Sequence, residues 1–184
     1  MNEIAPVKQQ FAQEMVIVSD GSMPYHLTKS EFEAMPATNK QLLIRDEIYG
    51  LQASAMKCIE DGVFADANPG CTLIHRFSPG VYVREFRMTK DSIVISKRHA
   101  REHIVMVLSG TASVTTEYGT ELISAPTIFI SHAGAKRVLV NHTDTVWATV
   151  HRTDACSVQE AEAELIINDR EDVERHLHNN LLKG

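Results

Sequence analysis

Two histidines, a carboxylate and a lysine fall within the seven residues from Lys97 to His103, which read Lys-Arg-His-Ala-Arg-Glu-His. Imidazole and carboxylate groups can bind a metal ion or transfer protons. On a helix, the spacing His-x-x-Glu-His is that of an inverted zinc-peptidase motif. Between strands, the same residues would form a histidine-bearing corner of a small β-barrel. The flanking elements therefore decide which chemistry the segment can perform.

The residues on both sides of this segment favour strands. Residues 92–96 read Ser-Ile-Val-Ile-Ser, and residues 104–109 read Ile-Val-Met-Val-Leu-Ser. Both runs are rich in β-branched residues, and Gly110 follows too soon for a helix of normal length. A zinc peptidase needs His99 and His103 one turn apart on a helix. The flanking sequence therefore argues against the peptidase and favours the barrel.

The hydrophobic pattern divides the chain of 184 residues into three zones. Residues 1–70 predict a mainly helical N-terminal extension, because apolar residues recur there at helical spacing. Residues 71–151 predict a β-barrel, because short alternating runs rich in Val, Ile and Thr are separated by Gly, Pro, Asp and Asn. Residues 152–184 begin with the capping box Ser157 to Glu160 and predict a C-terminal helical tail. The apolar helical stripe of the first zone consists of Ile44, Ile48, Leu51, Ala55 and Ile59.

The spacing in the middle zone resembles the two sequence motifs of the cupin family. The first motif runs Gly, five residues, His-x-His, three or four residues, Glu, six residues, Gly. Its two His positions and its Glu position fall on Lys97, His99 and His103, ahead of Gly110. The second motif runs Gly, five residues, Pro-x-Gly, two residues, His, three residues, Asn. Its positions fall on Pro126, His132-Ala-Gly134, Arg137 and Asn141.

The resemblance implies a mostly β fold, namely a single cupin-type jelly-roll barrel with an N-terminal helical extension and a C-terminal helix. It also implies an oligomer, and the apolar stripe of the first zone offers a surface for a homodimer. Within the cupins, the string Lys97-x-His99-x-x-Glu102-His103, with residues 144–151 downstream, resembles small uncharacterised proteins of bacteriophages. This narrower resemblance implies no established activity.

Two basic residues stand where the family has metal ligands. A standard cupin binds Fe, Mn, Ni or Zn through three His and one Glu, but Lys97 and Arg137 occupy two of these positions here. Because two cations repel a metal ion, the standard site does not transfer residue by residue. His151, which ends a strand, is the best candidate to complete a displaced site with His99 and His103. Alternative ligands for this third position are His75, His132 or an inward-turned Glu102, although strand alternation opposes the last of these.

A pocket without metal is the alternative. Lys97, His99, His103 and Arg137 would then line the barrel mouth as a cationic pocket. Such a pocket suits a carboxylate or phosphate group, with arginine as the bidentate partner. In addition, Trp147 or Tyr82 could stack on a ring of the ligand.

Three functions fit these residues. The first is a phage-type, small-molecule-binding protein, whose cationic, histidine-containing pocket takes an anionic or nucleotide-like ligand and could sequester it. The second is a metal-dependent cupin enzyme (an oxygenase, isomerase or lyase) with His103 or Glu102 as acid or base. The third is a structural or virion-associated protein that uses the barrel for assembly. The sequence leaves open whether the protein is an enzyme.

The composition narrows the partners and the location. A net charge of −6 argues against a nucleic-acid surface, which needs clustered Lys and Arg. Three widely spaced cysteines indicate free thiols in a reducing compartment. No apolar run approaches the roughly 20 residues that span a bilayer, and the first residues lack the features of a signal peptide. We therefore expect no membrane partner and a cytoplasmic location, in the host if the protein is viral, with the virion as an alternative.

Overall fold

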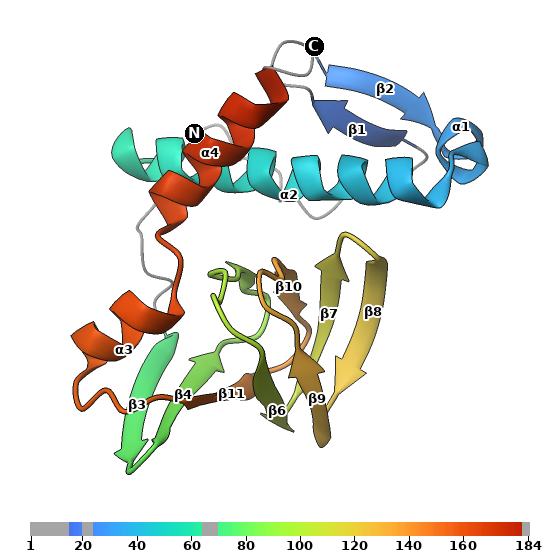
Figure 1. Ribbon diagram of the computed structural model, residues 1–184. Helices are drawn as coiled ribbons and strands as arrows, with labels where there is room; N and C mark the ends of the chain where they lie inside the picture. The colour runs from blue at the N-terminus through green and yellow to red at the C-terminus, as the bar shows by residue number, and fades with distance from the viewer. Residues whose placement is uncertain (1–14, 20–23, 64–69, 182–184) are drawn as a thin grey trace, which may run out of the picture.

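The computed structural model describes residues 15–19, 24–63 and 70–181 of the chain (Figure 1). One antiparallel sheet contains the strands β3 (Thr72–Ser78), β4 (Val81–Met88), β6 (His103–Ser109), β9 (Thr127–Ser131) and β11 (Thr145–Arg152). The other contains β5 (Ile93–Ile95), β7 (Thr111–Thr116), β8 (Gly119–Ser124) and β10 (Val138–Asn141). The strand order is β3-β4-β11-β6-β9 in the first sheet and β5-β10-β7-β8 in the second.

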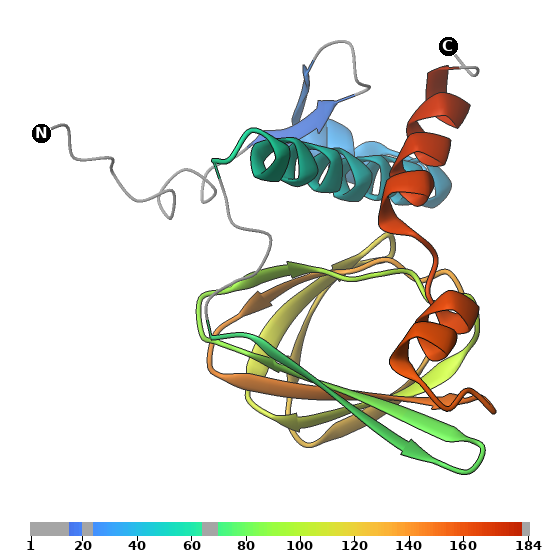
Figure 2. The same cartoon turned by 90° about the vertical axis from the view of Figure 1, so that its left-hand side faces the viewer.

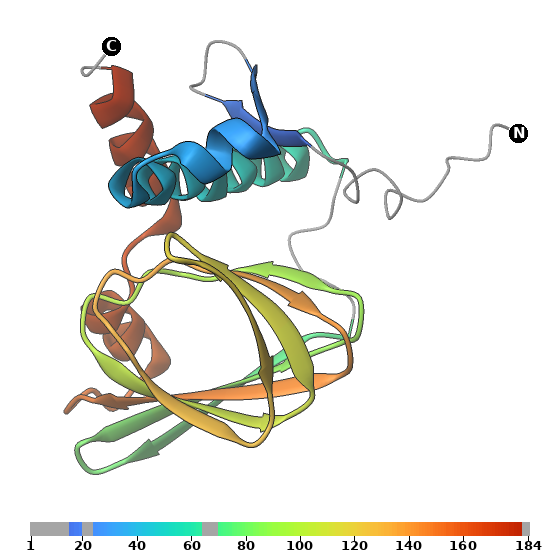
Figure 3. The same cartoon turned by 90° about the vertical axis from the view of Figure 1, so that its right-hand side faces the viewer.

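This strand order is that of a jelly roll. The strands β4, β11, β6 and β9 lie in one sheet and face β5, β10, β7 and β8 in the other, so that two Greek keys close into one barrel. Figures 2 and 3 show the two sheets curving around a common interior. The predicted fold class is confirmed: the protein is mostly β, with a jelly-roll barrel and helices on either side of it in the described part of the chain.

Strand alternation determines which side chains enter the barrel. In β6, Val105 and Val107 are buried, whereas Ile104 and Leu108 are exposed. Because successive side chains of a strand point to opposite faces, His103 points inward like Val105. The apolar core at the other end of these strands consists of Met88, Val105, Val107, Ala112, Val114, Leu139 and Trp147. The barrel therefore has an apolar end and an end that carries histidine.

The turn between β6 and β7 requires a glycine. Gly110 has a φ angle of 83°, a conformation that residues with a Cβ rarely adopt. A Cβ at this position would also overlap the backbone carbonyl oxygen of Asp144. The last glycine of the first sequence motif is thus explained by backbone conformation and by close packing.

The segments outside the barrel include four helices and a hairpin. These are β1 (Met15–Ser19), β2 (Pro24–Thr28), α1 (Lys29–Ala34), α2 (Ala37–Glu60), α3 (Val158–Leu165) and α4 (Asp169–Leu181). The N-terminal extension thus contains a two-stranded hairpin beside its predicted helices. Helix α2 lies across one side of the barrel, α4 crosses α2, and α3 lies against the barrel (Figures 2 and 3). We call α2 and α4 together the helical cap.

The buried face of α2 differs from the predicted apolar stripe. Its buried residues are Ile48, Tyr49 and Gln52, whereas Leu51 of the stripe is 46% exposed. The hydroxyl of Tyr49 donates a hydrogen bond to Asp172 of α4 at 2.9 Å. This polar contact orients α2. An apolar sequence pattern cannot predict such a contact.

Helix α3 begins where the capping box Ser157 to Glu160 predicts. The backbone N–H of Glu160 donates to the hydroxyl of Ser157 at 3.2 Å, and the Glu160 carboxylate accepts from the N–H of Cys156 at 2.9 Å. The polar segment that follows forms the regular helix α4. Across the described ranges, no helix combines the length and the apolar character needed to cross a membrane.

Candidate metal centre and adjoining cavity

Two of the candidate metal ligands lie on neighbouring strands of the five-stranded sheet. His103 begins β6, and His151 lies near the end of β11. The two strands are paired in register, with Val107 opposite Trp147 and Val105 opposite Thr149. His103 and His151 continue these inward-facing rows. Both are buried, with 6% and 3% of their surface exposed, respectively.

His99 reaches the same place from outside the strands. It lies in the segment between β5 and β6, where it forms a single antiparallel bridge with Ile166. The segment therefore pairs with the linker between α3 and α4 rather than with a barrel strand. The imidazole Nδ1 of His99 is buried and has no hydrogen-bond partner among the described residues.

The three histidines form one cluster. A nitrogen of each imidazole lies within 4.8 Å of the corresponding nitrogens of the other two. The ring centroids of His99 are 4.2 Å from those of His103 and 4.8 Å from those of His151, and His103 and His151 are 4.5 Å apart. The structure thus brings together the set predicted for a displaced metal site.

Burial keeps these three side chains neutral. It is the main reason why the pKa of His99 falls to about 2 and that of His151 to about 3. The pKa of His103 is also lowered, first by burial and then by the charge of Arg137. A neutral imidazole offers a lone pair, which is the form that binds a metal. All three side chains are therefore in the ligand form at neutral pH.

Hydrogen bonds leave suitable nitrogens free. The Nδ1–H of His103 donates to the backbone carbonyl of Arg101 at 3.1 Å, which leaves Nε2 as the lone-pair nitrogen. His151 Nε2 lies 3.0 Å from the hydroxyl of Thr149. Three imidazole nitrogens suit Fe, Ni or Zn. His99, His103 and His151 are therefore the residues that would hold such an ion.

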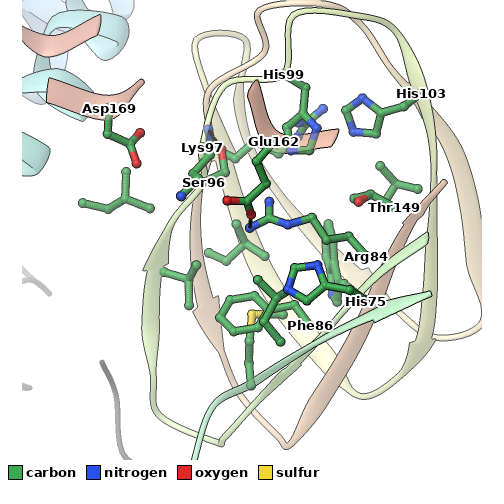
Figure 4. A pocket seen from close by; sticks show the side chains of 18 of the residues that line it. His75, Arg84, Phe86, Ser96, Lys97, His99, His103, Thr149, Glu162 and Asp169 are labelled. Carbon is green, nitrogen blue, oxygen red and sulfur yellow. Dashed lines mark hydrogen bonds and ion pairs between the residues drawn. The ribbon is translucent and has the colours of Figure 1, made fainter. Parts of the chain in front are cut away.

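The cluster borders a cavity of about 660 Å³ inside the barrel (Figure 4). Its apolar walls include Leu73, Phe86, Met88, Val94, Ile95, Val105, Leu139, Trp147 and Val158. Its polar lining includes His75, Arg84, Ser96, Lys97, His99, His103, Arg137, Thr149, Glu162 and Asp169. A volume of this size is typical of small-molecule pockets.

One of the cavity arginines has a carboxylate partner and another does not. Arg84 Nη2 lies 3.2 Å from an oxygen of Glu162, which reaches in from α3 (Figure 4). Arg137 forms no ion pair with any described residue. Its guanidinium lies 5.9 Å from the centroid of the Phe129 ring, and burial lowers its pKa. Lys97 also has no carboxylate partner among the described residues, but it is exposed, so the partly buried cavity cation without such a partner is Arg137.

The structure places most, but not all, of the predicted ligand-binding residues at this cavity. Lys97, Arg137 and Trp147 line it together with His99 and His103, whereas His151 lies behind these two histidines and outside the lining. Tyr82 lies outside the lining, because α3 covers it: Tyr82 is fully buried with Ala161 of that helix. Its hydroxyl lies 2.6 Å from Nδ1 of His75, and its ring stacks on Phe77 at 4.8 Å, so the fully buried Tyr82 offers no free ring face to a ligand.

Two residues suggested as alternative ligands lie elsewhere. The carboxylate of Glu102 pairs with His132 at 2.8 Å, and both side chains are largely exposed. Strand alternation therefore correctly indicates that Glu102 faces away from His103. Arg84 was missed as a cavity residue. The alternation of β4 could have revealed it, because Arg84 shares a face with Phe86.

Comparison with known proteins finds structural neighbours only. No protein-family model and no curated protein matches the sequence. A salicylate 1,2-dioxygenase from Pseudaminobacter salicylatoxidans has 13% identity and a TM-score of 0.44, covering 61% of this chain and 34% of that one. A cupin domain from Bordetella pertussis Tohama I has 17% identity and a TM-score of 0.39, covering 47% and 97%. KdgF from Halomonas sp. has 15% identity and a TM-score of 0.40, covering 46% and 80%. This chain thus spans about a third of the length of the dioxygenase.

Proposed function

We propose that this barrel binds a divalent transition metal ion through His99, His103 and His151, and an anionic small molecule in the cavity beside it. The meeting of three neutral imidazoles at one point, two of them (His99 and His103) in the lining of the cavity, carries the proposal. The buried Nδ1 of His99 without a partner adds to it, because a buried polar atom normally has one. Iron, manganese, nickel and zinc are the candidate ions, and imidazole favours iron, nickel and zinc among them.

Arg137 is the proposed anchor of the anion. The charge of Arg84 is offset by Glu162, so the cavity keeps an excess of positive charge at Arg137. A guanidinium binds carboxylate or phosphate groups through two parallel hydrogen bonds. The indole N–H of Trp147 is buried, without a hydrogen-bond partner among the described residues, and is a further donor at the cavity wall. A small carboxylate or a nucleotide-like phosphate fits this chemistry.

Metal-dependent catalysis is the second candidate function. Three protein ligands leave coordination positions open, which distinguishes catalytic from structural metal sites. A metal ion held there would polarise a bound water or substrate oxygen. Of the two residues considered as acid or base, Glu102 faces away from the cavity, whereas His103 is a proposed ligand. In this site the residues that can orient a substrate are Arg137 and Thr149.

Metal analysis of the purified protein tests the first part of the proposal. We expect about one Fe, Mn, Ni or Zn ion per chain after loading and dialysis. His151→Gln should lower the metal affinity by at least about 10-fold, whereas the exposed His132→Gln should leave it unchanged. A metal content near zero in the wild type, or an unchanged affinity in a His103→Gln/His151→Gln double variant, would refute the metal site.

Titration with small anions tests the second part. Carboxylates and phosphates of different size are added to the metal-loaded protein, and binding is followed by calorimetry. Arg137→Gln should weaken the binding of every anion that the wild type binds, by about 10-fold or more. Arg87→Gln is the matched control, because Arg87 pairs with Glu85 outside the cavity at 2.8 Å. Equal anion affinity in the Arg137 variant and the wild type would rule out this anchor.

We also propose that the chain forms a homodimer, through the outer face of the five-stranded sheet rather than through the α2 stripe. Ile104, Leu108, Ile128 and Ile130 are 45–70% exposed on this face, and Ile104 lies opposite Ile130 across β6 and β9. Apolar patches of this kind mark association surfaces. Light scattering should give the dimer mass for the wild type and the monomer mass for Ile128→Lys/Ile130→Lys. A dimer that survives in this variant contradicts the proposed surface.

A further inference from the structure

The linker between α3 and α4 pairs with the backbone on both sides of His99. Ala100 N–H donates to the carbonyl of Leu165 at 2.8 Å, and Ile167 N–H donates to the carbonyl of Arg98 at 2.9 Å. The linker between α3 and α4 thus pairs with the segment that carries His99 in the manner of a short antiparallel strand. On its other side, the His99 carbonyl accepts from the N–H of Gly134 at 2.8 Å.

The side chain next to His99 joins three parts of the molecule. Arg98 Nη1 lies 2.5 Å from Asp172 of α4 and 3.2 Å from the hydroxyl of Tyr49 of α2. Its Nε donates to the carbonyl of Gly134 at 3.1 Å. The Tyr49 hydroxyl in turn donates to the second oxygen of Asp172 at 2.9 Å. Arg98, Tyr49 and Asp172 therefore form a closed triangle, which we call the cap latch.

The cap latch is buried, which distinguishes it from a surface ion pair. Tyr49 is 1% and Asp172 is 2% exposed. Lys136 lies 3.3 Å from Asp169 at the start of α4, and its ammonium is 5.6 Å from the centroid of the Tyr49 ring. His176 stacks on the same ring at 3.9 Å. Helix α4 thus makes several further contacts around the latch.

We propose that Arg98, Asp172 and Tyr49 are positioning residues of the metal centre, which set the place of His99 relative to His103 and His151. This inference rests on the proposed metal site. His103 and His151 have their positions set by the strands β6 and β11, whereas His99 has no barrel strand to hold it. Groups that orient metal ligands typically contribute 10- to 100-fold to metal affinity. The cap latch would therefore contribute to metal affinity without touching the metal.

The test compares Asp172→Asn with Glu85→Gln. Glu85 of β4 is the matched control, because it is a buried carboxylate that pairs with two arginines, Arg76 of β3 and Arg87 of β4. Zinc affinity by competition and the visible spectrum of the cobalt-loaded protein are measured for full-length variants. We expect a zinc affinity about 10- to 100-fold weaker and a changed cobalt spectrum for Asp172→Asn, and wild-type values for Glu85→Gln. Wild-type affinity and spectrum in Asp172→Asn would overturn the inference.

Two additions keep the outcome decisive. If Asp172→Asn does not fold, Tyr49→Phe replaces it, because this change removes only the hydroxyl of the latch. A metal-free measurement separates this inference from the proposed function: the amide exchange of Ala100 and the NMR signals of the His99 ring. If the wild type binds no metal, the proposed function fails. In that case the inference about the cap latch is still supported if the Ala100 exchange and the His99 ring signals differ between the latch variant and the wild type. It is overturned if they are the same.

Discussion

Two histidines of the cluster lie on barrel strands and the third lies on a loop, and different kinds of structure hold the two parts. His103 and His151 lie on adjacent strands of a jelly roll, and the backbone ladder and the apolar core fix their positions. His99 lies on a segment that is held by three backbone hydrogen bonds and by the buried cap latch. The cluster thus combines a rigid pair with a third ligand that depends on elements outside the barrel. Variants of the barrel core and variants of the cap latch should therefore differ in how much they change stability and metal affinity.

The largest effect should come from the barrel core. Trp147→Ala removes a side chain that is 7% exposed and packs edge-on against Phe129 at 6.0 Å. We expect the free energy of unfolding to fall by about 3–5 kcal/mol, with loss of metal binding because β11 carries His151. Urea unfolding and metal content measure both effects. The control Leu122→Ala, at a position 68% exposed, should change stability by less than about 0.5 kcal/mol; a similar loss in both variants would contradict the assignment of the core.

Acid should destabilise the metal-free protein through the histidines. The pKa of His151 falls from 6.5 to about 3 on folding, so the unfolded chain binds more protons between these values. Its contribution to stability is therefore fully present above pH 6.5 and is lost as the pH falls toward about 3. The loss for this side chain is about 1.4 kcal/mol per pH unit, or about 2 kcal/mol at about pH 5.

Urea unfolding between about pH 7 and pH 5 checks this dependence. His151→Gln should give a shallower decline than the wild type, and the exposed His132→Gln should not. Equal slopes in the wild type and His151→Gln would show that His151 titrates normally.

A smaller effect is expected at the cap. Tyr49→Phe removes a hydroxyl that bonds to both Asp172 and Arg98, and should cost about 1–2 kcal/mol of stability. Metal affinity should fall although the barrel stays folded, which would distinguish the cap from the barrel core. Tyr118→Phe, at a position 78% exposed, is the control. Unchanged metal affinity in Tyr49→Phe would indicate that the cap contributes stability alone.

The smallest effect on stability is expected at Glu162, a residue of α3 that lines the cavity. Glu162→Gln leaves Arg84 without its carboxylate partner and should change stability by less than about 1 kcal/mol, because a third of the side chain is exposed. The freed charge should raise the ratio of dicarboxylate to monocarboxylate affinity by roughly 2- to 5-fold. Calorimetry measures this ratio. Glu164 lies on the same helix as Glu162 but pairs with Arg101. Glu164→Gln should therefore leave the ratio unchanged.

Much of the barrel and part of the site follow from local sequence features. The alternation from His103 to Val107 indicates that His103 faces the core. The spacing from Lys97 to Gly110 resembles a known barrel motif, and the structure provides a reason for Gly110 in its positive φ angle. The buried face of α2 could not be predicted in this way, because contacts of Tyr49 with Asp172 orient that helix.

The sequence by itself determined the period of the barrel strands, the inward face of His103 and the start of α3, because these depend on neighbours a few residues away. The tertiary structure decided that His151, rather than His75 or His132, completes the cluster, since β11 follows β6 by more than thirty residues and lies beside it only in the jelly-roll order. It also decided that Glu162 neutralises Arg84 and that α3 covers Tyr82. These are contacts between distant segments, and packing selects them rather than local backbone preference.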